Sequence, residues 1–140
     1  MAKRSSGGTT GVRRKQSGLE FQNLIAFVAT QDPIPARAFY RDRLGLRLVS
    51  EDSFALAFEV GGTMLRVTTV KEVAKAAYTV LGWQVPNILR AAKSLEKAGV
   101  SLERYAGIEQ DELGIWKSPS GARVAWFKDP DGNTLSITQF

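Results

Sequence analysis

Residues 127–139 read FKDPDGNTLSITQ, in which Asp-Pro-Asp-Gly-Asn separates two segments of alternating apolar and polar residues. Pro130 restricts its own backbone, the flanking aspartates can accept hydrogen bonds from nearby amides, and Gly132 can adopt a positive φ. Alternation with a period of two is the pattern of a strand that buries one face. This stretch therefore predicts a β-hairpin.

A strand and a helix precede this hairpin in the sequence. Residues 78–85 (YTVLGWQV) are strand-like, and Asn87 can cap a helix that Gly99 ends. Apolar residues recur at helical spacing within that helix, at Ile88, Leu89, Ala92, Leu95 and Ala98. Further short strands are expected near residues 101–105, 113–117, 122–128 and 133–139.

The first half of the chain follows the same plan. Residues 24–30 (LIAFVAT) predict a buried strand, and Asp32 followed by Pro33 predicts a helix that runs to about Leu44. Three strand-like stretches follow, within residues 47–52, 53–60 and 63–70. The pattern indicates a βαβββ module present twice, at residues of about 21–70 and 78–140. Because each module alone is small for a core, we predict an α+β fold in which two βαβββ modules form a paired mixed sheet around a cleft.

Two stretches carry a resemblance to a known family. The motif F-x-D-P-D-G-N-x-L-x-I-x-Q at residues 127–139, together with AFYRDRLGL at residues 38–46, resembles the vicinal oxygen chelate superfamily. That group includes glyoxalase I, extradiol dioxygenases, fosfomycin-resistance transferases and bleomycin-resistance proteins. The resemblance covers residues of about 21–140 and implies a glyoxalase/bleomycin-resistance-like fold and a homodimer whose subunits together shape the pockets.

The resemblance also implies four positions for metal ligands. Enzymes of this superfamily hold a divalent metal between the sheets, and the corresponding positions here are Ile25, Arg66, Val80 and Ser136. Isoleucine and valine cannot ligate, arginine repels a cation and a lone serine is a poor ligand. The chain contains no histidine and no cysteine. We therefore expect a metal-free branch of the superfamily, with no cofactor and no catalytic residue.

The net charge of +5 lies in one segment. Residues 1–18 contain five of the 19 Lys and Arg residues and no acid, which leaves residues 19–140 with 14 basic and 14 acidic residues. We predict a basic flexible tail at residues 1–18 and a single domain at 19–140. A neutral body makes nucleic acid an unlikely partner, although a role of the tail in nucleic-acid binding is a weaker alternative. No apolar run is long enough to cross a membrane, and a cytoplasmic protein is expected.

Candidate ligand-binding residues come from strand alternation and from aromatic residues near the expected cleft. Arg66 places a permanent cation where relatives keep their metal, unless Glu59 or Glu112 pairs with it. Trp83 is expected in the core, and Phe54 near the rim of the cleft. The candidates for ligand binding are Phe27, Phe58, Arg66, Tyr78, Trp116, Trp126 and Ser136.

Two functions from different classes follow from these observations. The first is metal-independent binding or sequestration of a small, partly aromatic molecule, similar to bleomycin-resistance-type antibiotic resistance proteins. Bleomycin itself fits poorly, because it is cationic and its binders are acidic, whereas residues 19–140 are neutral. The alternative is a superfamily enzyme (a lyase, isomerase or dioxygenase) with atypical metal ligands, for which Gln84, Glu59 and Glu112 are the candidates.

Overall fold

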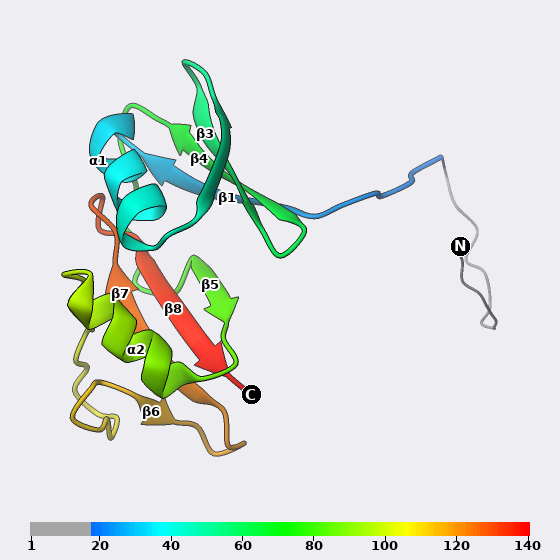
Figure 1. Ribbon diagram of the computed structural model, residues 1–140. Coiled ribbons are helices and arrows are strands. Elements are labelled where there is room, and N and C mark those ends of the chain that lie inside the picture. The colour runs from blue at the N-terminus through cyan, green and yellow to red at the C-terminus, as the bar shows by residue number, and fades with distance from the viewer. Residues whose placement is uncertain (1–17) are drawn as a thin grey trace.

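The computed structural model describes residues 18–140, and the tail predicted at residues 1–18 lies outside the described residues except for Gly18. Two βαβββ modules follow one another along the chain (Figure 1), which confirms the predicted α+β fold class. The first module contains β1 (Ile25–Thr30), α1 (Pro33–Arg37), η1 (Ala38–Arg43), β2 (Arg47–Glu51), β3 (Ala55–Val60) and β4 (Thr63–Thr69). The second contains β5 (Leu81–Gln84), α2 (Ile88–Lys97), β6 (Trp116–Lys117), β7 (Arg123–Lys128) and β8 (Thr134–Gln139).

Each module forms a four-stranded mixed sheet with the same topology. The strand orders are β1-β4-β3-β2 and β5-β8-β7-β6, and in each sheet the first and last strands of the module pair in parallel. The remaining pairs are antiparallel, including β7 with β8, which form the hairpin predicted from residues 127–139. The duplication inferred from the spacing of the caps is therefore present in the sheet order as well.

The two helices begin where their caps predict, but the first helix is irregular. Asp32 accepts a 3.0 Å hydrogen bond from the amide of Ile34, and Asn87 accepts one of 3.0 Å from the amide of Arg90. After Arg37 the chain continues as the π-helical segment η1, in which the amide of Leu44 bonds to the carbonyl of Phe39. The expectation of one regular helix to Leu44 is thus corrected, because the hydrogen bonds widen by one residue over its second half.

Two strands are shorter in the structure than the sequence predicts. Within residues 101–105 only Leu102 forms a bridge, with Phe127, and within residues 113–117 only β6 is a strand. The intervening residues bond through side chains: the Gln110 amide nitrogen donates to the carbonyls of Glu103 and Gly114. These bonds satisfy backbone groups that a sheet would otherwise pair.

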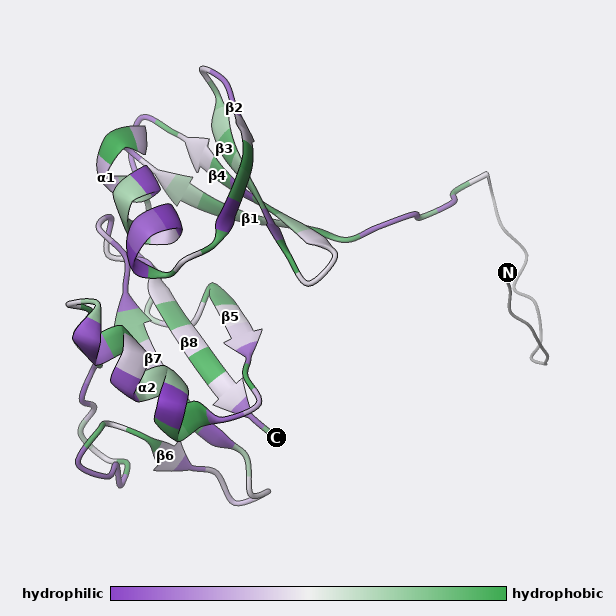
Figure 2. Ribbon diagram, viewed as in Figure 1, coloured by the Kyte–Doolittle hydropathy of each residue, from purple (hydrophilic) through white to green (hydrophobic). Residues whose placement is uncertain are grey.

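One core joins the modules, because the helices and the helix-covered faces of both sheets pack together. Figure 2 shows α2 with alternating hydrophilic and hydrophobic bands, and its buried residues are Ile88, Ala92 and Leu95. Phe39 of η1 lies 6.4 Å from Phe127 of β7, measured between ring centroids. The core contains Val28, Phe39, Tyr40, Leu56, Phe58, Leu65 and Val67 from the first module and Ile88, Ala92, Leu95, Phe127, Leu135 and Ile137 from the second.

Candidate functional site

Each sheet has a second face that the core does not cover, called here the open face. On the first sheet, β1 and β4 pair Phe27 with Arg66, and β3 places Ala57 on the other side of Arg66. Phe27 is 59% exposed, and its neighbours Ile25 and Met64 on the same face are exposed as well. An apolar open face within a single chain is a surface that a ligand or another chain can cover.

Arg66 lies half-buried in the middle of this open face without a counter-ion. Among residues 18–140 it forms no ion pair and no hydrogen bond. Glu59 instead pairs with Arg47 at 3.4 Å and accepts a 2.7 Å hydrogen bond from the amide of Gly62. The possibility that Glu59 or Glu112 neutralises Arg66 is therefore not realised, and the guanidinium keeps its donors for another partner.

The carboxylate of Asp52 is held by the backbone at the edge of this sheet. It accepts hydrogen bonds from the amides of Phe54 (2.8 Å) and Ala55 (3.0 Å). These two amides lower the pKa of Asp52, and the charge of Arg66 contributes to the same direction. Phe54 itself is exposed in the loop that Asp52 organises.

The open face of the second sheet carries a pocket lined by aromatic residues. It has a volume of about 510 Å³ and is lined by Ala76, Ala77, Tyr78, Thr79, Tyr105, Ile108, Trp116, Trp126, Lys128 and Thr134. The rings of Trp126 and Trp116 lie 5.9 Å apart, and Tyr105 packs edge-on against Trp126 at 5.4 Å. This volume falls within the range of roughly 300–1,000 Å³ that is common for small-molecule sites.

Hydrogen bonds fix two side chains in this pocket. The indole nitrogen of Trp126 donates to the hydroxyl of Thr79 at 3.1 Å, and the ammonium group of Lys128 donates to the hydroxyl of Thr134 at 3.0 Å. Burial raises the pKa of Tyr105, and the nearby Glu103 acts in the same direction, so the phenol keeps its proton to higher pH than an exposed tyrosine does. The lining includes no acidic residue, so Lys128 carries its only formal charge.

Ser136 lies on the same open face, between β5 and β7. It pairs with Gly82 on one side and with Trp126 on the other, and it is mostly buried. A Cβ atom at position 82 would approach the Ser136 hydroxyl oxygen to 2.6 Å. Glycine at this position therefore leaves room for the Ser136 side chain.

One of the predicted site residues lies elsewhere. Phe58 is fully buried in the core, where its ring lies 6.0 Å from that of Tyr40. Because β3 pairs Ala57 with Arg66, alternation turns Phe58 to the opposite, helix-covered face beside Leu65. The expectation that Phe58 borders the cleft is corrected on this ground. Trp83 is on the covered face as expected, with its ring stacked on Phe127 at 6.3 Å.

The structure thus divides the remaining candidates between the two sheets. Phe27 and Arg66 are neighbours on the first open face, whereas Tyr78, Trp116 and Trp126 line one pocket on the second, with Ser136 beside Trp126. Sequence reasoning missed Tyr105, Thr79 and Lys128. Lys128 follows Trp126 by two residues, so strand alternation was a signal that could have placed it on the same face.

The residues at the four implied metal positions do not fit a divalent ion. Ile25 and Val80 present hydrocarbon, Arg66 is a cation, and Ser136 offers one hydroxyl. Within residues 18–140 no three His, Cys, Asp or Glu side chains gather where they could hold a metal. The alternative ligands lie on separate elements, Glu59 on β3, Gln84 on β5 and Glu112 in the loop before β6.

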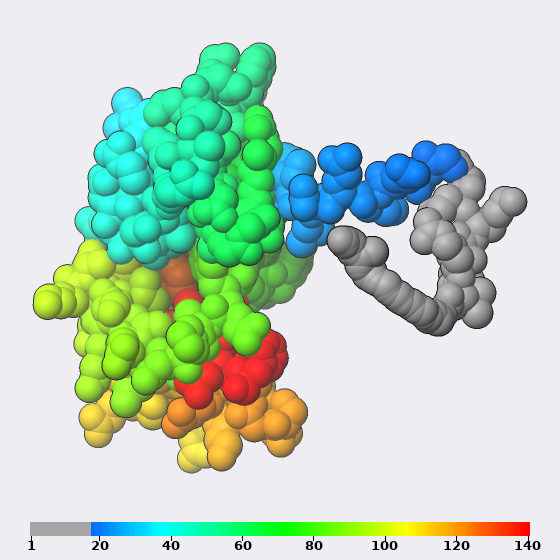
Figure 3. Space-filling model, turned by 45° about the vertical axis from the view of Figure 1, so that its right-hand side comes forward, coloured from blue at the N-terminus to red at the C-terminus, as the bar shows by residue number. Residues whose placement is uncertain are grey.

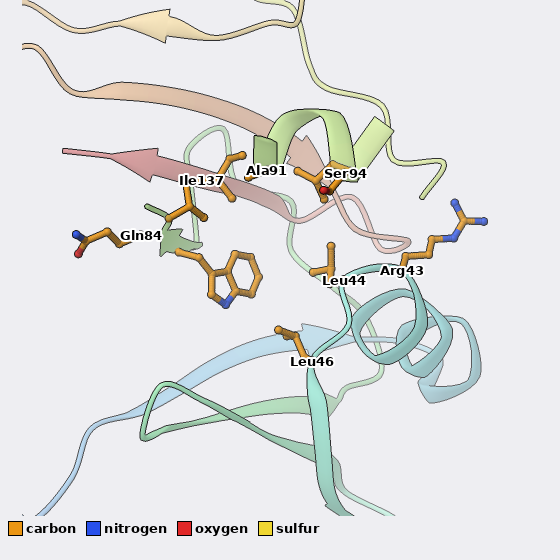
Figure 4. Close-up of a pocket in the computed structure, with 10 residues that line it drawn as sticks. Arg43, Leu44, Leu46, Gln84, Ala91, Ser94 and Ile137 are labelled. Atoms are coloured by element: carbon orange, nitrogen blue, oxygen red, sulfur yellow. The ribbon is translucent and has the colours of Figure 1, made fainter. Parts of the chain in front are cut away.

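A second hollow lies at the seam between the modules (Figure 4). Its volume is about 280 Å³, and it is lined by Arg43, Leu44, Leu46, Trp83, Gln84, Val85, Ala91, Ser94, Leu95 and Ile137. The side chains of Arg43 and Gln84 point away from its centre, and most of the remaining lining is apolar (Figure 4). This hollow offers packing surface and few groups that could orient a polar ligand.

The chain matches a family model over residues 23–137, that of the Glyoxalase/Bleomycin resistance protein/Dioxygenase superfamily. The match spans most of the chain, and the protein therefore belongs to this superfamily. The resemblance inferred from residues 38–46 and 127–139 is confirmed.

Solved structures support the same fold. A glyoxalase family protein from Bacillus anthracis superimposes with a TM-score of 0.68 at 16% identity, covering 89% of this chain and 98% of the other. A superfamily member from Sphaerobacter thermophilus DSM 20745 gives 0.66 at 20% identity, covering 86% and 98%. Lactoylglutathione lyase from Agrobacterium tumefaciens gives 0.61 at 17% identity, covering 89% and 95%. At these identities the likeness shows the fold alone, and no curated protein matches the chain.

Among the helices of residues 18–140, none is both long and apolar enough to cross a bilayer.

Proposed function

We propose that this protein binds a small, partly aromatic molecule between the open faces of its sheets, without a metal ion. The observation that carries the proposal is the pocket of Tyr78, Tyr105, Trp116 and Trp126, combined with metal positions whose residues do not make up a set of metal ligands. Flat rings of Trp and Tyr bind flat apolar ligands by stacking and by burial of apolar surface. Such a site supports binding or sequestration, as in bleomycin-resistance-type proteins, and assigns no catalytic residue.

A homodimer is part of this proposal. The modules of one chain meet through their helix-covered faces, which leaves Phe27, Met64 and Tyr78 exposed. The segment before β1 also extends away from the body, and its Phe21 is 88% exposed (Figures 1 and 3). A second copy can cover these surfaces and bring an open face of one sheet opposite an open face of another. The resemblance to dimeric relatives supports the same arrangement.

Calorimetric titration with 2-naphthamide, a neutral flat aromatic compound, tests the binding. We expect saturable binding with the same affinity in protein dialysed against a chelator, in untreated protein and after addition of Zn²⁺. Size-exclusion chromatography with light scattering should give twice the mass of one 140-residue chain. Absence of saturable binding of both this amide and the corresponding acid, 2-naphthoate, contradicts the proposal.

Elemental analysis of protein purified without a chelator separates binding from the enzymatic alternative. We expect no stoichiometric metal. Nickel, zinc, iron or manganese at one equivalent per chain, with binding that requires it, would support a lyase, isomerase or dioxygenase with atypical ligands instead. Such a result would direct attention to Glu59, Gln84 and Glu112.

A further inference from the structure

We propose that the pocket on the second sheet is specific for aromatic anions, and that Lys128 binds the acidic group while Trp126 stacks on the ring. This inference rests on the proposed function and names the class of ligand. The expected ligands are flat mono- or bicyclic rings that carry a carboxylate or a similarly placed anionic oxygen.

No acidic residue of the pocket lining balances the charge of Lys128. Its ammonium group has three donors, and the described structure assigns it one acceptor, the hydroxyl of Thr134. Within residues 18–140 no carboxylate forms an ion pair with it. Two donors therefore remain for a ligand, and the pocket lining offers no acid that would satisfy them internally. Lys128 is exposed, so water occupies these donors in the free protein, and a bound anion would replace that water with charge-assisted hydrogen bonds at the edge of the aromatic pocket.

The ring of Trp126 has a fixed position in the pocket. Trp126 is held by its hydrogen bond to Thr79 and by Tyr105 and Trp116, which pack against it at 5.4 and 5.9 Å. A side chain so restrained loses little freedom when a ligand stacks on it, which favours binding. Since the bond to Thr79 occupies the indole donor, the pocket offers an anion mainly the ammonium group and the two phenols of Tyr78 and Tyr105.

The ring of Trp126 and the charge of Lys128 are close to each other along β7. Lys128 and Trp126 lie on one strand, two residues apart, and face the same side. Their backbone positions are separated by about 6.8 Å at about 3.4 Å per residue. This spacing suits an acidic group attached directly to a ring, as in an aromatic carboxylic acid. A cationic ring system would repel the ammonium group, and a neutral one would leave it without a charged partner.

Calorimetry with the matched pair 2-naphthoate and 2-naphthamide tests this inference. The two compounds share a ring and differ in charge. For the unmodified protein we expect about threefold to fivefold tighter binding of the acid, the size of one ion pair at an exposed ammonium group. Lys128→Met should abolish that preference while changing the affinity for the amide less than about twofold. Lys128→Arg should retain the preference. Lys117→Met, at an exposed lysine on the neighbouring strand outside the pocket lining, is the matched control and should change neither affinity.

The outcomes distinguish this inference from the proposed function. Equal affinities for acid and amide in the unmodified protein overturn the anion specificity and leave aromatic binding intact. Loss of both affinities in Lys128→Met, in protein whose melting temperature is unchanged, also overturns it. If Arg66→Met removes the preference for the acid and Lys128→Met retains it, the anion binds on the first sheet and the inference is wrong. If neither compound binds to the unmodified protein, both proposals fail.

Discussion

The hydroxyl of Tyr40 donates a 2.7 Å hydrogen bond to the carboxylate of Asp129, which lies 89 residues away in the other module. Both residues are buried. Asp129 also accepts bonds from the amides of Asp131 and Asn133 and from the side-chain amide of Asn133, each 2.8 or 2.9 Å long. The two sequence stretches that carry the family resemblance thus contact each other, and the turn of the last hairpin is bonded to the first module.

Removal of this hydrogen bond should weaken the joint between the modules. Tyr40→Phe deletes only the hydroxyl and leaves Asp129 with three of its four donors. A buried hydrogen bond to a charged group contributes about 1.5–3 kcal/mol, so we expect the free energy of unfolding in urea to fall by that amount. Tyr78→Phe, at an exposed tyrosine, is the control and should change stability little. Equal stability of Tyr40→Phe and the unmodified protein would show that the bond contributes nothing.

The same pair predicts a loss of stability at alkaline pH. Burial raises the pKa of Tyr40 far above its usual value of 10.0, and the charge and hydrogen bond of Asp129 raise it further. The folded protein keeps this proton where the unfolded chain releases it, so the stabilisation is complete below pH 10.0 and declines as pH rises above it. The slope for one proton is about 1.4 kcal/mol per pH unit. Urea unfolding measured from about pH 9 to about pH 11 should therefore show a shallower decline in Tyr40→Phe than in the unmodified protein. Parallel curves for the two proteins would contradict the assignment.

Local signals in the sequence were sufficient for most of the fold. Helix caps act over two or three residues, so Asp32 and Asn87 mark the starts of α1 and α2 correctly. The turn from Asp129 to Asn133 is equally local, because its amides bond to the Asp129 side chain. The hydrogen bond from Tyr40 to Asp129 could not be predicted from local sequence, since it depends on how two distant segments pack.

The site was harder to predict because it depends on pairing between strands. The aromatic ring of Phe58 favours a place at the cleft, and only the register of β3 with β4 shows that Ala57, not Phe58, lies beside Arg66. Tyr105 belongs to a segment with almost no regular structure, so no periodicity places it against Trp126. Trp116 and Trp126, by contrast, lie on β6 and β7, within stretches that the sequence predicts as strands.

A double-mutant cycle at Gly82 and Ser136 tests the contact between β5 and β8. Ala at position 82 would crowd the Ser136 hydroxyl at 2.6 Å, which forces that side chain to rotate. The rotation costs about 0.5–1.5 kcal/mol and offsets the gain of about 0.4–1 kcal/mol that Gly→Ala brings by restricting the unfolded chain. We therefore expect Gly82→Ala to be nearly neutral in the unmodified protein and stabilising in the Ser136→Ala background. Additive effects on the free energy of unfolding would show that the two residues are not in contact.

Replacement of Trp126 should separate its binding role from its structural one. Trp126→Leu removes the ring that Tyr105 and Trp116 contact and leaves an apolar side chain on β7. Loss of one aromatic stacking partner corresponds to about 1–3 kcal/mol, so the affinity for 2-naphthamide should fall at least about fivefold. Phe54→Leu is the control, because Phe54 is exposed in a loop outside the pocket lining. Thr79→Val keeps the ring of Trp126 but removes its hydrogen-bond acceptor, and it should produce a smaller loss of affinity. If Trp126→Leu folds normally and binds 2-naphthamide as tightly as the unmodified protein, the aromatic pocket is not where the ligand binds.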